Sequence, residues 1–345
     1  MAMQPDMLPP SVSGLGASMR RREFIALLAS TPIAWPLGAH AQRSDKVFRV
    51  GSLYMADAFK RFGFDQAFIS GMHELGYVTG QNIVYETRHA AGDRTRLPAL
   101  VDELMLLKPD VIATGEPIVP IVLSKTSTIP IVMFYSSDPV AAGLVKSLSH
   151  PGGNVTGVSM QWAELPPKQI ELLREMLPKL ARVGHLHDTR VPSAKMAEQL
   201  AREAALKLGI AYTPYYVANR SDLDRAFAQM EEQRPEALLF GAGSDLMSGL
   251  ILTIIHNATH LGIPLCIPDR NAARLGAPIG YGPDLVAGYR LAATYVDKIL
   301  KGAKPSDLAV QQPTKFELAI NLKTAKALGL DISPAVLARA DEVIE

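Results

Sequence analysis

Short apolar runs alternate with segments of helical periodicity from residue 47 onward, and this alternation constrains the fold more than any other feature. The helical segments carry apolar residues at every third or fourth position, as Phe64, Phe68, Met72 and Leu75 do. The runs between them lie at 47–54, 82–88, 111–114, 131–135, 183–187, 211–217, 237–240 and 265–267. Strands that alternate with helices are typical of parallel βαβ units. We therefore expect an α/β fold with doubly wound parallel sheets.

The strand–helix pattern falls into two series. The sequence Pro151-Gly152-Gly153-Asn154 interrupts it, and a separate segment at 279–283 leads into an amphipathic helix at 285–300. This arrangement predicts two lobes joined by a hinge that the chain crosses more than once. We expect a first lobe of residues 47–155 plus about 282–305, and a second lobe of residues 156–278 plus about 306–345.

The first 41 residues have the pattern of a signal peptide rather than of a domain. Arg21-Arg22-Glu23-Phe24-Ile25 resembles a twin-arginine core, and the apolar stretch after it ends in Ala39-His40-Ala41. We predict cleavage near Ala41 and a periplasmic mature chain without a membrane span. Residues 1–18 fit neither a signal nor a domain, so either Met1 or Met19 is the true start.

Composition excludes several classes of protein. The chain has 35 Lys+Arg against 34 Asp+Glu, 48% apolar and 20% charged residues, so neither disorder nor a nucleic-acid partner is expected. The single Cys266 cannot form an internal disulfide or a cysteine-based zinc site. The pairs His185/His187 and His256/His260 each lack a third ligand. No nucleophile elbow, phosphate loop or dinucleotide fingerprint occurs in the mature chain, and we predict no catalytic residue, metal or cofactor.

Several segments resemble one bacterial family, and together they cover essentially all of the mature chain. They lie at 68–77, 80–83, 127–132, 138–145, 151–157, 293–300, 313–317 and 321–329. They are similar to ABC-transporter substrate-binding proteins, including tryptophan- and tyrosine-type uptake receptors. The resemblance implies a type I periplasmic-binding-protein fold whose lobes are joined by three crossings of the chain. It also implies a receptor that captures an amino-acid-like or other small polar solute between the lobes and delivers it to an inner-membrane ABC permease with its ATPase.

Ligands of open parallel sheets bind beyond the carboxyl ends of the strands, so the residues near those ends and just after them are the candidate ligand contacts. In the first lobe these are Ser52, Tyr54, Gly115, Glu116, Ser136, Ser137 and Asp138. At the crossings and in the second lobe they are Ser159, Asp188, Ser244, Asp245, Asp269 and Tyr281.

Some of these residues admit a second interpretation. Asp138 precedes Pro139, so it fits a helix cap as well as a ligand contact. Glu116 stands where family members more often carry a small or hydroxyl residue. It is either a partner for a ligand amine or hydroxyl, or a solvated or capping residue. If the ligand carries a protonated amine, we expect Glu116 or Asp138 to contact it. Tyr281 either covers a ligand ring or packs in the hinge.

Two alternatives to a transport receptor stay open. A periplasmic sensor subunit would have the same lobes but would signal to a membrane receptor instead of a permease. A periplasmic α/β enzyme would need a nucleophile–base pair or a metal site, and the sequence shows neither. Neighbouring genes for a permease and an ATPase would favour uptake.

Overall fold

The computed structural model describes residues 46–55, 63–241 and 243–345. The predicted signal region at 1–41, with its twin-arginine pattern and the choice between Met1 and Met19, lies outside these residues, as does the side chain of Asp245. Within the described ranges, no helix combines the length and the apolar composition that crossing a membrane requires. Residues 46–345 form one unit by their contacts.

The first sheet contains five parallel strands in the order β2-β1-β3-β4-β5. They are β1 (Phe48–Tyr54), β2 (Ile83–His89), β3 (Val111–Gly115), β4 (Ile131–Tyr135) and β5 (Val155–Gly157). The chain between them forms α3 (Phe64–Glu74), α4 (Leu97–Leu106) and α5 (Val119–Leu123). Every residue of β3 is buried, which explains its short apolar sequence. The strand order reverses between β1 and β3, as in a doubly wound sheet.

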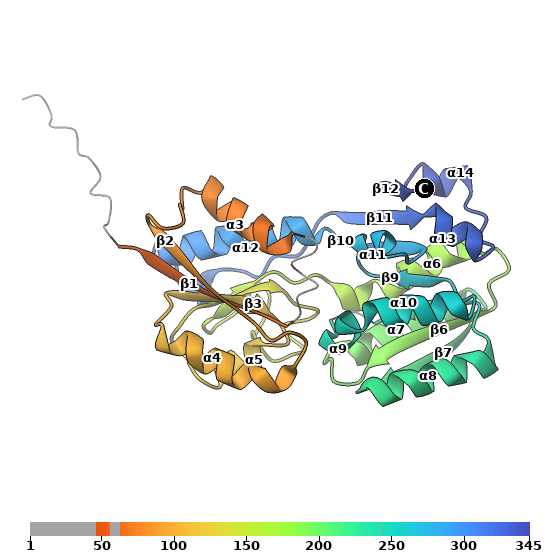
Figure 1. The fold of residues 1–345 in the computed structure, drawn as a ribbon, viewed down its shortest axis with the longest axis horizontal. Helices are drawn as coiled ribbons and strands as arrows, with labels where there is room; N and C mark the ends of the chain where they lie inside the picture. Colours follow the sequence, from red (N-terminus) through yellow and green to blue (C-terminus); the bar gives the residue numbers. More distant parts are fainter. Residues whose placement is uncertain (1–45, 56–62, 242) are drawn as a thin grey trace, which may run out of the picture. The chain divides into compact units, whose positions relative to one another are not determined.

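Helix α12 (Leu285–Leu300) packs against this first sheet although it comes late in the sequence. It lies beside α3 (Figure 1), and its Tyr289 ring stacks on Phe64 at 5.2 Å between ring centroids. The hydroxyl of Tyr77 donates to the carboxylate of Asp297 at 3.0 Å. We call the first sheet with α3–α5 and α12 the first lobe.

The close packing of α3 on α12 gives a test of this arrangement. A Cβ on Gly71 would lie 2.9 Å from the Cβ of Ala293, so a larger residue must push the helices apart. We expect Gly71→Val to lower the free energy of unfolding by roughly 1–3 kcal/mol. Gly153→Val is the matched control, because a Cβ at Gly153 meets no atom within 4 Å. Denaturant unfolding measures both variants, and equal stabilities would contradict the packing.

The second sheet contains seven strands in the order β12-β11-β10-β9-β8-β6-β7. They are β6 (Arg182–Asp188), β7 (Ala211–Val217), β8 (Ala237–Phe240), β9 (Leu265–Ile267), β10 (Ile279–Pro283), β11 (Phe316–Asn321) and β12 (Glu342–Ile344). The helices associated with it are α6 (Pro166–Met176), α7 (Ala194–Lys207), α8 (Arg220–Gln233), α9 (Asp245–Gly249), α10 (Ile251–His260), α11 (Asn271–Arg274), α13 (Leu322–Ala327) and α14 (Pro334–Leu337). We call this sheet with these helices the second lobe.

The α/β fold is confirmed, with one correction to the expectation of purely parallel sheets. Strand β11 runs antiparallel to β10, while the other neighbours in the second sheet are parallel. The chain leaves the sheet at the carboxyl end of β10, forms α12, and returns to the same end of the sheet. A strand that re-enters beside β10 from that end must run in the opposite direction.

The chain passes between the two sheets at three places, which lie after β5, after β10 and before β11. The first and third passages are paired, because the amide of Ser159 donates to the carbonyl of Gln311 at 2.9 Å and Val158 forms a parallel bridge with Gln311. The second passage meets the third where the amide of Asp284 donates to the carbonyl of Lys315 at 3.3 Å. The predicted bounds of the lobes stay a prediction, which the packing of α12 supports.

Candidate functional site

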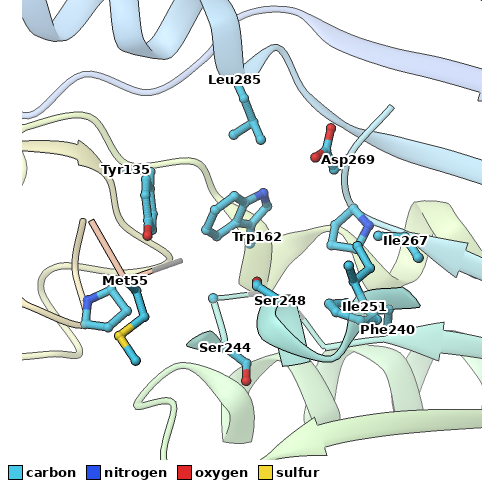
Figure 2. A pocket seen from close by; sticks show the side chains of 13 residues that line it. Met55, Tyr135, Trp162, Phe240, Ser244, Ser248, Ile251, Ile267, Asp269 and Leu285 are labelled. Carbon is cyan, nitrogen blue, oxygen red and sulfur yellow. The ribbon is translucent and has the colours of Figure 1, made fainter. Parts of the chain in front are cut away.

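A cavity lies where strand ends of the two sheets face each other (Figure 2). From the first lobe, Met55 follows β1, Pro117 follows β3 and Tyr135 ends β4. From the second lobe, Phe240 ends β8 and Ile267 ends β9. These are the carboxyl ends at which open parallel sheets bind their ligands, so the cavity is the candidate ligand site.

The cavity wall is largely aromatic and apolar. Tyr135 and Trp162 lie with their ring centroids 5.6 Å apart at an angle of 51°. Leu285, at the start of α12, and Ile251, at the start of α10, add aliphatic surface. Figure 2 shows Trp162 in the middle of the group, between Tyr135 on one side and Phe240 with Ile251 on the other. Such walls favour a ligand with a planar or bulky apolar body.

Local backbone geometry places the two rings from the first half of the chain. Trp162 begins the 3-10 turn Trp162–Glu164 after Gln161, whose φ of 54° is in the left-handed region. The indole nitrogen of Trp162 is buried and has no hydrogen-bond partner among the described residues. The ring of Tyr135 lies directly over Gly115, where a Cβ would overlap it. Gly115 therefore serves the site through close approach of Tyr135.

Among the described residues of the second lobe, three polar side chains line the cavity: Ser244, Ser248 and Asp269. The hydroxyl of Ser244 donates to the carboxylate of Asp188 at 2.6 Å and accepts from the amide of Met247 at 2.9 Å, so it caps α9. Asp269 accepts from the amide and the side-chain nitrogen of Asn271 at 2.9 and 3.0 Å through one oxygen, and burial raises its pKa.

Glu116 binds its own lobe rather than this cavity. One carboxylate oxygen accepts from the hydroxyl of Ser136 at 2.6 Å and from the amide of Ser137. Burial raises the pKa of Glu116, although these hydrogen bonds oppose the shift. The carboxylate therefore fixes the loop that follows β4.

Asp188 has the corresponding role in the second lobe. Its two oxygens accept from the guanidinium of Arg190 at 2.9 and 2.6 Å and from Ser244. Burial works against ionisation, but these hydrogen bonds lower the pKa of Asp188. Glu116, Asp188 and Arg190 line a second cavity together with Gly243, beside the first one.

The other predicted contacts lie away from the main cavity. Asp138 accepts from the amides of Val140 and Ala141 at 3.1 and 3.0 Å, so it stabilises a turn, as the capping interpretation expected. Tyr54 is buried in the first lobe, where its ring stacks on Phe134 at 5.5 Å, and burial holds its pKa well above the usual range.

Ser52, Ser159 and Tyr281 also lie outside the described lining of the main cavity. Ser52 is buried in β1, and Ser159 is buried in the first passage between the sheets. Tyr281 stacks on Phe316 at 6.3 Å within the second lobe, which matches the packing interpretation. Of the predicted contacts, the described lining of the main cavity contains Ser244 and Asp269.

Sequence reasoning overlooked most of the apolar lining, including Trp162 and Phe240, because it searched for polar side chains after strands. A usable signal was present. Tyr135 and Phe240 are the last residues of strands that the sequence predicted with these bounds. An aromatic residue at the carboxyl end of a buried strand would have pointed to the cavity wall.

The histidine pairs form no metal site in the part of the chain that the structure describes, where no group of three or more potential ligands occurs. The ring centroids of His185 and His187 lie 3.7 Å apart. Both bind the hydroxyl of Tyr212, at 3.1 and 2.8 Å. Burial lowers the pKa of both, to about 4 for His187. The pair is therefore neutral and structural at pH 7.

Comparison with known proteins agrees with this geometry. The family described as ABC transporter substrate binding protein matches residues 60–344. A tyrosine-binding protein of Clostridioides difficile is 26% identical over 267 residues, which cover 77% of this chain and 76% of that protein. A conserved domain protein of Vibrio cholerae has a structure with a TM-score of 0.80 and 28% identity, over 86% of this chain and 100% of that chain.

A Streptococcus pneumoniae ABC domain in complex with L-Trp also has a TM-score of 0.80, with 23% identity over 87% of this chain and 100% of that chain. The resemblance seen in the sequence is thus confirmed by a match that spans both lobes. This chain belongs to the ABC transporter substrate-binding protein family, which is a family of solute receptors and not of enzymes.

Proposed function

We propose that this chain is a periplasmic receptor that captures a small solute with a planar or bulky apolar body and delivers it to an inner-membrane ABC permease with its ATPase. The observation that supports this proposal is the cavity walled by Tyr135, Trp162 and Phe240 at strand ends of both sheets. Aromatic amino acids are the first solutes to test, because the relatives described above include a tyrosine-binding protein and a tryptophan complex. Export with cleavage near Ala41 is part of the proposal and rests on the pattern at 1–41.

The proposed mechanism is capture followed by closure of the lobes. An aromatic ring buries about 150–250 Å² of surface, which supplies roughly 4–6 kcal/mol when all of it leaves water. Both lobes contribute to the wall, so the full gain is reached only when the lobes close around the ring. Binding of the ligand therefore stabilises the closed form, which is the form that would dock on the permease. No bond is made or broken.

Trp162 gives a direct readout of ligand binding. The chain has two tryptophans, Trp35 and Trp162, and Trp35 lies in the predicted signal region. We expect L-tyrosine to change the emission of Trp162 in the mature protein when the excitation is chosen so that tyrosine does not absorb. We expect Trp162→Ala to weaken binding of L-tyrosine by roughly ten- to a hundredfold in calorimetry, because a large apolar contact is lost.

The matched control for this experiment is Tyr216→Ala. Tyr216 is an aromatic residue of β7 that is 52% exposed and is not among the described residues that line the main cavity. It should leave the affinity unchanged. If Trp162→Ala binds L-tyrosine as the wild type does, the cavity is not the binding site. If none of the aromatic amino acids binds to the wild type, the proposed ligand class is wrong.

A further inference from the structure

Asp269 differs from the rest of the cavity wall. Among the described lining residues it is the single carboxylate, and it stands at the end of the second-lobe strand β9, two residues after Ile267. Its neighbours in the cavity are mainly rings and aliphatic side chains. In Figure 2 its carboxylate lies on the same side of the cavity as Leu285, near the indole of Trp162.

The hydrogen bonds of Asp269 leave one oxygen available. Both bonds from Asn271 go to the same carboxylate oxygen, Oδ1. The nearby cations Arg270 and Arg274 favour the ionised form of Asp269 through their charge, but their hydrogen bonds go to other carboxylates. Arg270 donates to Glu317 at 3.0 Å, and Arg274 forms a two-point pair with Glu342 at 2.8 and 3.0 Å. Within the described part of the chain, Asp269 thus has no hydrogen-bonded ion pair of its own.

A carboxylate in an apolar cavity is costly unless a charged or strongly polar group satisfies it. A protonated amine provides both the charge and the hydrogen-bond donors. The surrounding rings of Tyr135, Trp162 and Phe240 would add to the attraction, because a cation is attracted to the face of an aromatic ring.

The two carboxylates that the sequence offered for this role are occupied. Glu116 binds Ser136 and Ser137, and Asp138 binds the amides of its own turn. Neither contributes to the described lining of the main cavity.

We propose that Asp269 binds the protonated amine of the solute, so that this receptor selects amines that carry a ring or a similar apolar body. This inference rests on the proposed function, because it assumes that the cavity holds the transported solute. The charge of Asp269 would make the receptor bind cationic ring compounds more tightly than anionic ones.

Two probes separate the charge from the ring. Tyramine and 3-(4-hydroxyphenyl)propionate share a phenol ring, but the first carries an amine and the second a carboxylate. We expect the wild-type protein to bind tyramine more tightly than the propionate in calorimetry. We expect Asp269→Asn to weaken tyramine binding by roughly ten- to a hundredfold and to leave propionate binding unchanged or tighter.

The control variant is Asp224→Asn, which makes the same change of charge at a pair on the surface with Arg220. It should bind both probes as the wild type does. Asp269→Asn keeps an oxygen that can accept from the amide of Asn271, and denaturant unfolding checks that its fold is retained.

The outcomes distinguish this inference from the proposed function. If L-tyrosine binds and Trp162→Ala weakens it, but Asp269→Asn does not change tyramine affinity, the role of Asp269 is refuted and the receptor function stands. A wild-type preference for the propionate refutes the inference in the same way. If neither probe nor any aromatic amino acid binds, both proposals fall together.

Discussion

Replacing Ser137 with leucine should weaken ligand binding by roughly ten- to a hundredfold while leaving the stability of the ligand-free protein nearly unchanged. Ser137 belongs to the first lobe, and Gly243 belongs to the loop before α9 in the second lobe. The two residues touch, because a Cβ on Gly243 would overlap the hydroxyl of Ser137. A leucine at 137 fills the space that Gly243 needs, so it should hold the lobes apart.

The backbone makes Ser137 the better of the two positions to change. Gly243 has a φ of 78°, so any side chain there adds strain of its own and mixes loss of stability with loss of closure. Glu116 holds Ser137 through its amide, which a substitution of the side chain leaves intact. Ser137→Leu therefore tests closure with little change to the first lobe.

Ser137→Ala is the matched control for the leucine variant. The hydroxyl of Ser137 is buried and has no hydrogen-bond partner among the described residues, so its removal should cost nothing in affinity. Calorimetry with L-tyrosine and denaturant unfolding of the ligand-free proteins read the two effects separately. Wild-type affinity in Ser137→Leu would show that this contact does not limit closure.

Acid should destabilise the second lobe through its buried histidine pair. Burial is the main cause that lowers the pKa of His187 to about 4; Glu198 opposes the shift and Arg202 adds to it. In the unfolded chain a histidine has a pKa of about 6.5, so between these values the unfolded state binds the extra proton. The contribution of neutral His187 to the free energy of unfolding is therefore fully present above pH 6.5 and is lost as the pH drops toward 4. His187 alone accounts for a loss of about 3 kcal/mol by pH 4.

His187→Gln measures this contribution. Glutamine can still bind the hydroxyl of Tyr212 but does not titrate, so the free energy of unfolding should fall less steeply between pH 6.5 and 4. His185, whose pKa is also lowered, contributes with the same sign and keeps a residual slope in the variant. His256→Gln makes the same exchange at an exposed site outside the buried pair and is the matched control. Identical pH profiles for the wild type and His187→Gln would contradict the assignment.

The fold was predictable where a strand forms an unbroken apolar run or a helix shows its period. Strands β4 and β7 and helix α12 have the bounds that the sequence predicted. Strand β9 has only three residues and was still predicted, because all three are apolar. Strands β5 and β12 are equally short but contain Thr156 and Gly157 or Glu342, so they form no apolar run. The antiparallel direction of β11 depends on where the chain re-enters the sheet, which no local sequence records.

The candidate site was less predictable than the fold, for a physical reason. Polar side chains after neighbouring strands can satisfy each other as well as a ligand, and Glu116 with Ser136 does so. The sequence shows which polar side chains follow the strands but not which of them form hydrogen bonds with each other in the folded protein. Both bonds from Asn271 go to one oxygen of Asp269, and the other oxygen has no hydrogen bond from the residues that the structure describes.

The late position of α12 has a consequence for the order in which the chain folds. The hydrogen bond between Tyr77 and Asp297 joins residues 220 positions apart, and Tyr289 and Val296 belong to the same apolar core as β1 and α3. A ribosome that has synthesised the chain as far as Asp284 has therefore supplied every strand of the first sheet without the helix that covers one part of it. Because β11 and β12 come later still, the second sheet is also incomplete at that moment. Contacts this distant in sequence slow folding, so the nascent chain stays unfinished in both lobes until synthesis is nearly over.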